Sequence, residues 1–187
     1  SDLYGPVADN GLVGTGLVDH LVATYLVLVP RPAPEREPAS PAQRAAFVPR
    51  FVNRGRSRCR DYLSGFVMEL HGPEPLRALG EEGIRALEVD PGNAAELSYY
   101  LVHAIGEAAA HPDRKVTLHP DERDSYGRPV PVIHLAWGDG EPRMARDMEE
   151  AALAVCDALA PAGSRIFPVR ETLRPGGTAH EAGTCGM

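Results

Sequence analysis

Short apolar runs separated by proline and glycine dominate this sequence, and they constrain its fold more than any other feature. The chain of 187 residues contains 19 glycines and 18 prolines. Proline interrupts helices and central strands, and glycine favours turns, so long regular elements are disfavoured over much of the chain. Strand-like runs bounded by these residues recur instead at 21–29, 45–53, 61–72, 114–120, 130–137 and 164–169.

Residues 141–163 form the clearest predicted helix, with Pro142 in its first turn and Gly163 after its end. Its expected apolar stripe contains Met144, Met148, Ala151, Val155 and Leu159. Residues 73–92 suit a helical or loop insertion, and 95–110 fit either a helix or a strand. The pattern predicts an α+β fold: a mostly antiparallel sheet of about six strands with helices packed on one face.

Composition narrows the possible partners. The net charge is -7, and a negative surface repels phosphate backbones, so we expect no nucleic-acid partner. The arginine-rich run at 50–60 is expected to be a solvated loop or sheet edge, with a phosphate site as the alternative. The longest apolar run, 21–30, is too short to span a bilayer, so we expect no membrane association.

The three cysteines, Cys59, Cys156 and Cys185, are widely spaced and form no CxxC motif. This spacing indicates neither a disulfide framework nor a zinc site, and the histidines show no metal-ligand spacing either. A reducing, cytoplasmic location fits these free thiols best. Because Cys185 has no base beside it in the sequence, we expect it to be a packed small residue rather than a nucleophile.

The segment "GGTAHEAGTCGM" (176–187) surrounds His180 with glycines. Glycine lets the backbone approach a ligand closely, and the near-neutral pKa of histidine suits a general base. The alternative is an ordinary histidine in a flexible tail.

Three stretches together resemble the glucose–methanol–choline family of flavin oxidoreductases. The segment 176–187 is similar to the family motif H-x-x-G-T-C/A-x-M, with His180, Gly183, Thr184, Cys185 and Met187 matching. "NGLVGTGLVDH" (10–20) resembles the family segment VGxNLxDH, and 115–137 resembles a family strand–turn–strand. The resemblance also favours a strand at 100–107.

Two family features are absent from this sequence. The family opens with a βαβ unit that carries GxGxxG for FAD, and it continues past the histidine motif to a second catalytic His or Asn. We therefore expect this chain to be the second half of such an enzyme without its last stretch. Its missing FAD-binding segment is then an expected partner, and the sequence indicates no oligomeric state.

The resemblance implies an FAD-dependent oxidation of an alcohol. In this reaction FAD accepts a hydride from the CH–OH carbon, and His180 matches the histidine that takes the hydroxyl proton. The implied substrate is a sugar, an aminosugar or a natural-product alcohol. The alternative is a catalytically inactive small-molecule-binding or interaction module that has lost its flavin domain.

The resemblance also assigns roles to further residues. Those expected near the cofactor are Asp19, His20, Gly183, Thr184 and Cys185, with His20 read as a positional residue. Those expected near the substrate are Phe66, Met68, Glu69 and His71, each with a core or rim position as the alternative. The expected organisation is an FAD-side segment at 1–20, a substrate-binding domain at 21–175 and an active-site loop at 176–187.

Overall fold

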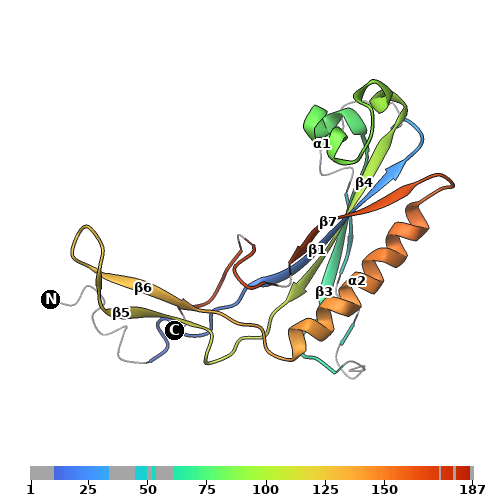
Figure 1. Ribbon diagram of the computed structural model, residues 1–187. Helices are drawn as coiled ribbons and strands as arrows, with labels where there is room; N and C mark the ends of the chain where they lie inside the picture. Colours follow the sequence, from blue (N-terminus) through green and yellow to red (C-terminus); the bar gives the residue numbers. More distant parts are fainter. Residues whose placement is uncertain are drawn as a thin grey trace.

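The computed structural model describes residues 11–33, 45–49, 52–53, 61–172, 174–178 and 180–185. The prolines at 34–43 and most of the arginine-rich run at 50–60 lie outside these residues. Figure 1 shows the elements, which are in chain order β1 (His20–Val29), β2 (Ala45–Val48), β3 (Phe66–Pro75), η3 (Leu76–Leu79), α1 (Gly80–Ala86), η4 (Pro91–Glu96), β4 (Ser98–Glu107), β5 (Lys115–Arg123), β6 (Pro129–His134), α2 (Gly140–Leu159) and β7 (Arg165–Thr172).

Five strands form one antiparallel sheet in the order β2-β3-β4-β1-β7. The interior strand β1 is rich in β-branched and aliphatic residues, which suit a pleated surface with neighbours on both sides. It pairs with β4 along its whole length, from His20 opposite Glu107 to Val29 opposite Ser98. This pairing resolves the ambiguous stretch at 95–110 as a strand, and it confirms the α+β class with a mostly antiparallel sheet.

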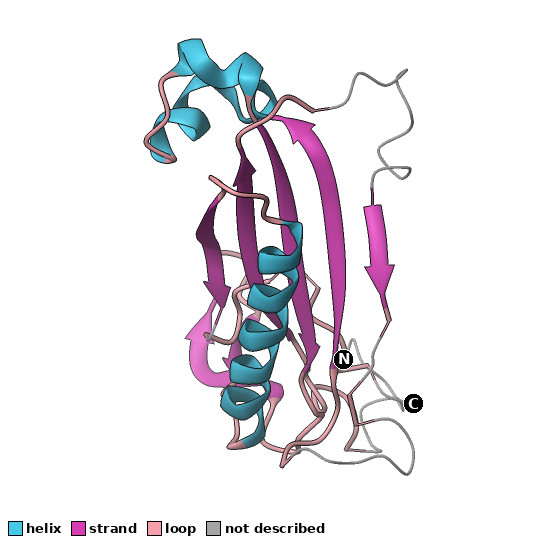
Figure 2. Cartoon of the chain, turned by 90° about the vertical axis from the view of Figure 1, so that its right-hand side faces the viewer, coloured by secondary structure: helices cyan, strands magenta, loops and turns pink. Residues whose placement is uncertain are grey.

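One face of the sheet is covered by α2, which lies in front of the strands and runs roughly along them in Figure 2. Alternate residues of β1, including Leu21, Val27 and Val29, pack there against the helix. The buried stripe of α2 differs in part from the expected one, because Met144 and Met148 are followed by Ala152 and Cys156. The expected Ala151, Val155 and Leu159 flank this stripe and are only partly buried.

The opposite face of the sheet is covered only in part. Leu26, Leu28 and Tyr99 pack against the insertion formed by η3, α1 and η4, which caps one end of the sheet. The prediction of a helical or loop insertion at 73–92 is therefore confirmed as helical. Beyond this insertion, no described helix covers the face, and we call the remaining part the helix-free face.

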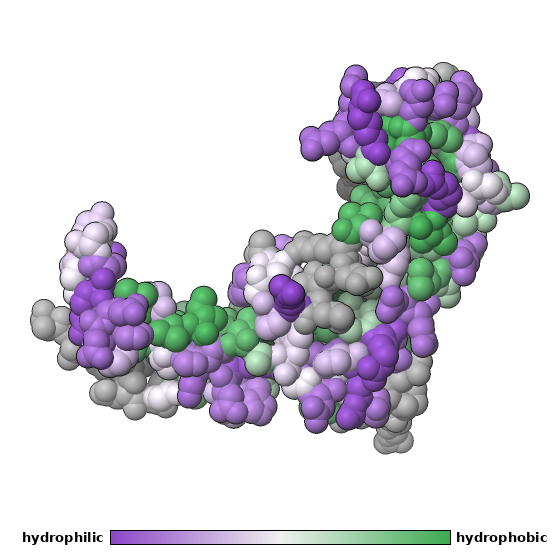
Figure 3. All heavy atoms as spheres, in the orientation of Figure 1, coloured by the Kyte–Doolittle hydropathy of each residue, from purple (hydrophilic) through white to green (hydrophobic). Residues whose placement is uncertain are grey.

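Strands β5 and β6 form a separate hairpin that projects away from the sheet (Figure 1). A hydrophobic band runs along this arm in the space-filling view (Figure 3). The large apolar side chains exposed on the arm and on the neighbouring segment are Leu12, Val13, Leu118, Tyr126 and Ile133.

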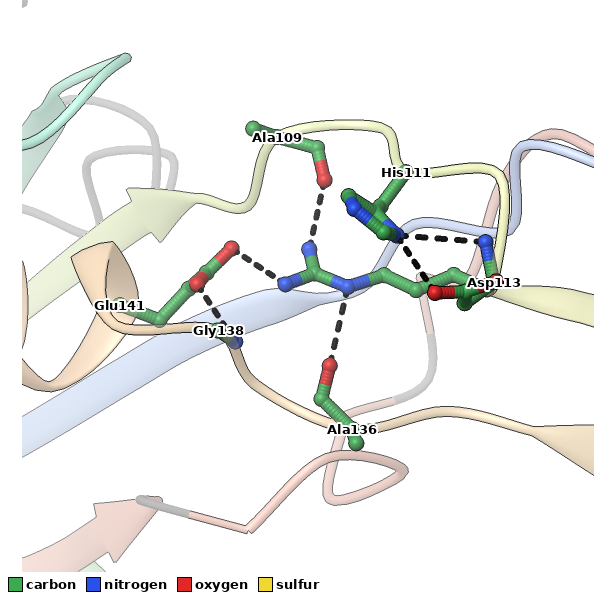
Figure 4. Close-up of polar contacts among 7 residues, drawn as sticks. Ala109, His111, Asp113, Ala136, Gly138 and Glu141 are labelled. Carbon is green, nitrogen blue, oxygen red and sulfur yellow. Dashed lines mark hydrogen bonds and ion pairs between the residues drawn. The ribbon is translucent and has the colours of Figure 1, made fainter.

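The root of the arm is fixed by a buried ion pair (Figure 4). The Arg114 guanidinium lies 2.7 Å from the Glu141 carboxylate, and both side chains are buried. Arg114 also donates to the backbone carbonyls of Ala109 and Ala136, and Glu141 accepts from the Gly138 amide at 3.0 Å. Because each charge has partners, this cluster is satisfied, and it joins the start of β5 to the start of α2.

Candidate functional site

Two segments that are far apart in the sequence lie side by side at one end of β1. Val18 and Ala182 exchange two backbone hydrogen bonds of 3.0 Å, and Val13 forms a bridge with Cys185. Thr184 donates to Thr15 at 3.0 Å. Residues 11–20, 174–178 and 180–185 therefore form one unit, which we call the clasp.

Asp19 is the centre of the clasp. Its side chain is 1% exposed, and its carboxylate accepts hydrogen bonds from the His20 amide and the Gly176 amide, both at 2.7 Å, and from the Thr178 hydroxyl. Burial raises the pKa of the Asp19 carboxyl, but these hydrogen bonds outweigh burial and hold the pKa below its ordinary value. Asp19 is thus a buried anion that joins the start of β1 to the loop before His180.

The clasp brings His20 and His180 together. Their ring centroids are 5.9 Å apart, and the rings meet edge to face at 74°. His180 is exposed, and its backbone amide lies 3.4 Å from the Thr178 hydroxyl. The exposed imidazole of His180 therefore lies beside the imidazole of His20. Asp19 anchors the backbone of His20 directly and the backbone of His180 through Thr178.

A hollow of about 400 Å³ lies beside His20 on the helix-free face. Val67 of β3 and Ile105 of β4 contribute apolar side chains to it, and Glu107 lies at its edge. Its other lining residues are Gly65, Phe66 and Gly106. This hollow is open to solvent and has room for a small molecule next to the histidine pair.

A polar cluster follows the hollow on the same face. The Thr24 hydroxyl lies 3.0 Å from Nδ1 of His103, and the His103 ring meets the His71 ring edge to face at 5.3 Å. Nε2 of His71 lies 3.5 Å from the Glu69 carboxylate. Burial and the neighbouring His71 lower the pKa of His103, while Glu69 opposes this change, so His103 favours its neutral form.

The predicted cofactor residues fall into two groups. Asp19 and Gly183 contribute to the structure of the clasp. Asp19 accepts backbone hydrogen bonds from His20 and Gly176. Gly183 lies against the Gly16 carbonyl at a φ of +92°, and a Cβ at this position would collide with that carbonyl. His20 and Thr184 are partly exposed, and Cys185 is exposed. The expectation that Cys185 is packed is wrong, because its side chain is exposed. Cys156 is the packed cysteine instead, and burial raises its thiol pKa to about 11.

The predicted substrate residues are divided between the two faces. Phe66 and Met68 are 2% and 4% exposed and belong to the core beneath α2. Phe66 also borders the hollow, whereas Met68 does not. Glu69 and His71 lie on the helix-free face, where both are partly exposed. The structure thus brings Glu69 and His71 together and separates them from Met68.

Thr24, His103 and Thr178 take part in the site although the sequence did not single them out. The strand periodicity of 98–107 contains a signal for His103, because it places His103 on the same face as Ile105 and Glu107. The pairing of Glu69 with His103 then joins two strands. Thr178 has no comparable signal, since its partner Asp19 is 159 residues away.

No family model matches this chain, and no curated protein shows a significant match to it. Among the described residues, no helix is long and apolar enough to cross a membrane. The same part of the chain contains no cluster of three or more His, Cys, Asp or Glu side chains placed to hold a metal ion.

Proposed function

We propose that this chain is part of an FAD-dependent alcohol oxidoreductase that resembles the glucose–methanol–choline family, and that His180 is its catalytic base. One observation carries the proposal. The segments 10–20 and 176–187 each resemble a family motif, and their described residues meet in the clasp beside an open hollow. Two motifs chosen from sequence alone are thus neighbours in space, as residues of one active site must be.

The described residues fit the ring end of FAD and not its phosphate end. His180 and Cys185 are both exposed, so a flat ring system has access to each of them. The N-terminus of α2 would attract phosphate, but it is occupied by Glu141 with Gly138 and Arg114. We therefore assign the phosphates of FAD to a separate FAD-binding segment and the flavin ring to His20, His180, Thr184 and Cys185.

In the proposed reaction, bound FAD supplies an acceptor for the hydride of the alcohol carbon. The neutral imidazole of His180 accepts the hydroxyl proton at a ring nitrogen, which favours loss of the hydride from the same carbon. His20 borders the imidazole and restricts its orientation. The hollow receives the rest of the alcohol against Val67 and Ile105. This reaction fits the cytoplasmic location proposed from the cysteines.

The test uses the complete gene product that contains this chain. We expect the purified protein to show flavin absorption bands, and we expect an alcohol substrate to bleach them in the absence of oxygen. His180→Ala should lower the rate of bleaching by about 10²–10⁴-fold, the usual contribution of a general base. His134→Ala is the matched control, because His134 is exposed on the arm.

A colourless gene product that binds no added FAD would contradict the enzyme proposal. If that product still binds small alcohols, the alternative of an inactive binding module is supported. An unchanged bleaching rate in His180→Ala would reject the role of His180 and leave the flavin assignment in place.

A further inference from the structure

The helix-free face carries three consecutive rows of side chains across β1, β4 and β3. The first row places His20 opposite Glu107, next to His180. The second row is entirely apolar and consists of Val22, Ile105 and Val67, which are paired in register. The third row is polar and consists of Thr24, His103 and Glu69.

The spacing of these rows follows from strand geometry. Residues i and i+4 of a strand share a face and are separated by about 13 Å, since each residue advances the strand by about 3.3 Å. The first and third rows are related in this way, and the second lies midway between them. The hollow of about 400 Å³ is lined by His20 and Glu107 of the first row and by Ile105 and Val67 of the second, so an occupant that extends further along the strands reaches the third row.

The third row is equipped to receive a hydrogen-bond donor. Nδ1 of His103 lies 3.0 Å from the Thr24 hydroxyl. In the tautomer with the proton on Nδ1, this nitrogen donates to the Thr24 oxygen, and Nε2 is an acceptor with no hydrogen-bond partner among the described residues. Glu69 contributes a carboxylate that is partly exposed and contacts His71 through one oxygen. An imidazole nitrogen and a carboxylate oxygen at the end of an apolar strip match a hydroxyl or an ammonium group.

We infer that the substrate is an elongated alcohol with an apolar middle and a second hydrogen-bond-donating group at its far end. The inference rests on the proposed function, since it takes the reacting hydroxyl to lie at His180. The apolar middle lies on Val22, Ile105 and Val67, and the far hydroxyl or ammonium group lies at Glu69 and His103. A linear chain of about eight carbon atoms with a polar atom at each end is about 11 Å long when extended, because each bond of about 1.5 Å advances a zigzag chain by only about 1.25 Å. The hydrogen bonds at its two ends cover the rest of the distance between the rows.

The experiment measures binding to the 187-residue chain without flavin, so it does not depend on turnover. The probes are 1-octanol, 1,8-octanediol, 8-amino-1-octanol and 1,4-butanediol, and the readout is the NMR signal of each histidine ring. We expect all three eight-carbon probes to shift His20, and only the two with a second polar end to shift His103. Those two should bind about tenfold more tightly than 1-octanol, which corresponds to about 1.4 kcal/mol, because each adds a hydrogen bond to a charged group.

Glu69→Gln tests the position of the far group. It should remove most of the gain for 8-amino-1-octanol while leaving the affinity for 1-octanol unchanged, which also shows that the variant is folded. Glu122→Gln makes the same change of charge on the exposed arm. It should change neither the affinity for 8-amino-1-octanol nor the affinity for 1-octanol. 1,4-Butanediol is too short to reach both rows and should show no gain.

Equal affinities for 1-octanol and 1,8-octanediol would overturn the inference, as would a gain that survives Glu69→Gln or an absence of any binding. These results are separate from the test of the flavin proposal. Flavin bleaching by alcohols without discrimination at the far end would leave the enzyme proposal standing and reject this inference. Tighter binding of the probes with two polar ends by a gene product without flavin would support binding of both ends on the helix-free face and reject the enzyme proposal.

Discussion

The two faces of the five-stranded sheet are built from the same strands and have opposite characters. Beneath α2, the alternate residues are almost entirely apolar and buried, as in Leu21, Val27 and Val102. On the helix-free face, the intervening residues include His20, Glu69 and His103, and several of them are partly exposed. Because side chains alternate between the two faces of a strand, one set packs in the core beneath α2, and the other set is accessible on the helix-free face.

The largest difference between the faces should appear on truncating an apolar side chain. Met148→Ala removes a side chain that is 1% exposed beneath α2, and we expect it to lower the free energy of unfolding by about 2–5 kcal/mol. Ile105→Ala on the helix-free face should cost about 1 kcal/mol, because part of its side chain is already in water. Urea unfolding of both variants measures the difference, and equal losses would contradict the distinction between the faces.

The second prediction concerns the clasp, which closes one end of the helix-free face. Gly183→Ala adds a Cβ that collides with the Gly16 backbone, so we expect a loss of about 1–3 kcal/mol and weaker protection of the Ala182 amide against hydrogen exchange. Gly127→Ala is the matched control, because Gly127 also has a positive φ but has open space around it. Similar losses in both variants would show that strain, rather than contact with Gly16, determines the result.

The smallest expected effect is the change in folding stability with pH that His103 causes on the helix-free face. Because the pKa of His103 is lowered in the folded chain, acidification protonates the unfolded chain first. Stability should therefore fall as the pH drops below about 6.5 and should level off below the pKa of folded His103. Urea midpoints at about pH 8 and about pH 5.5 measure this loss, which should be smaller in His103→Gln. An equal loss in that variant would assign the effect to other groups.

The sequence predicted the strands well because alternation and bounding prolines are local signals. Residues 21–29 and 164–169 correspond to β1 and β7, and the helix at 141–163 corresponds to α2. The buried stripe of α2 shifted to Ala152 and Cys156 because the sheet contacts a row with four-residue spacing. That choice depends on the packing partner, which the helix sequence does not contain.

The candidate site was predicted less completely, and for a related reason. Strand alternation places Phe66 and Met68 on one face and Glu69 on the other, but it does not tell which set α2 covers. The hydrogen bond from Thr178 to Asp19 joins residues 159 positions apart, and no local pattern encodes it. The resemblance indicated both clasp segments, whereas the contact between them came only from the structure.

The position of β1 has a consequence for the synthesis of this protein. β1 precedes the other described strands in the chain, yet it pairs with β4, which ends at Glu107, and with β7, which ends at Thr172. The ribosome must therefore produce nearly all of the described chain before β1 is fully paired. Until then "HLVATYLVLV" is an apolar strand with at least one unpaired edge, the kind of segment that aggregates. Efficient production should therefore depend on chaperones that bind nascent chains.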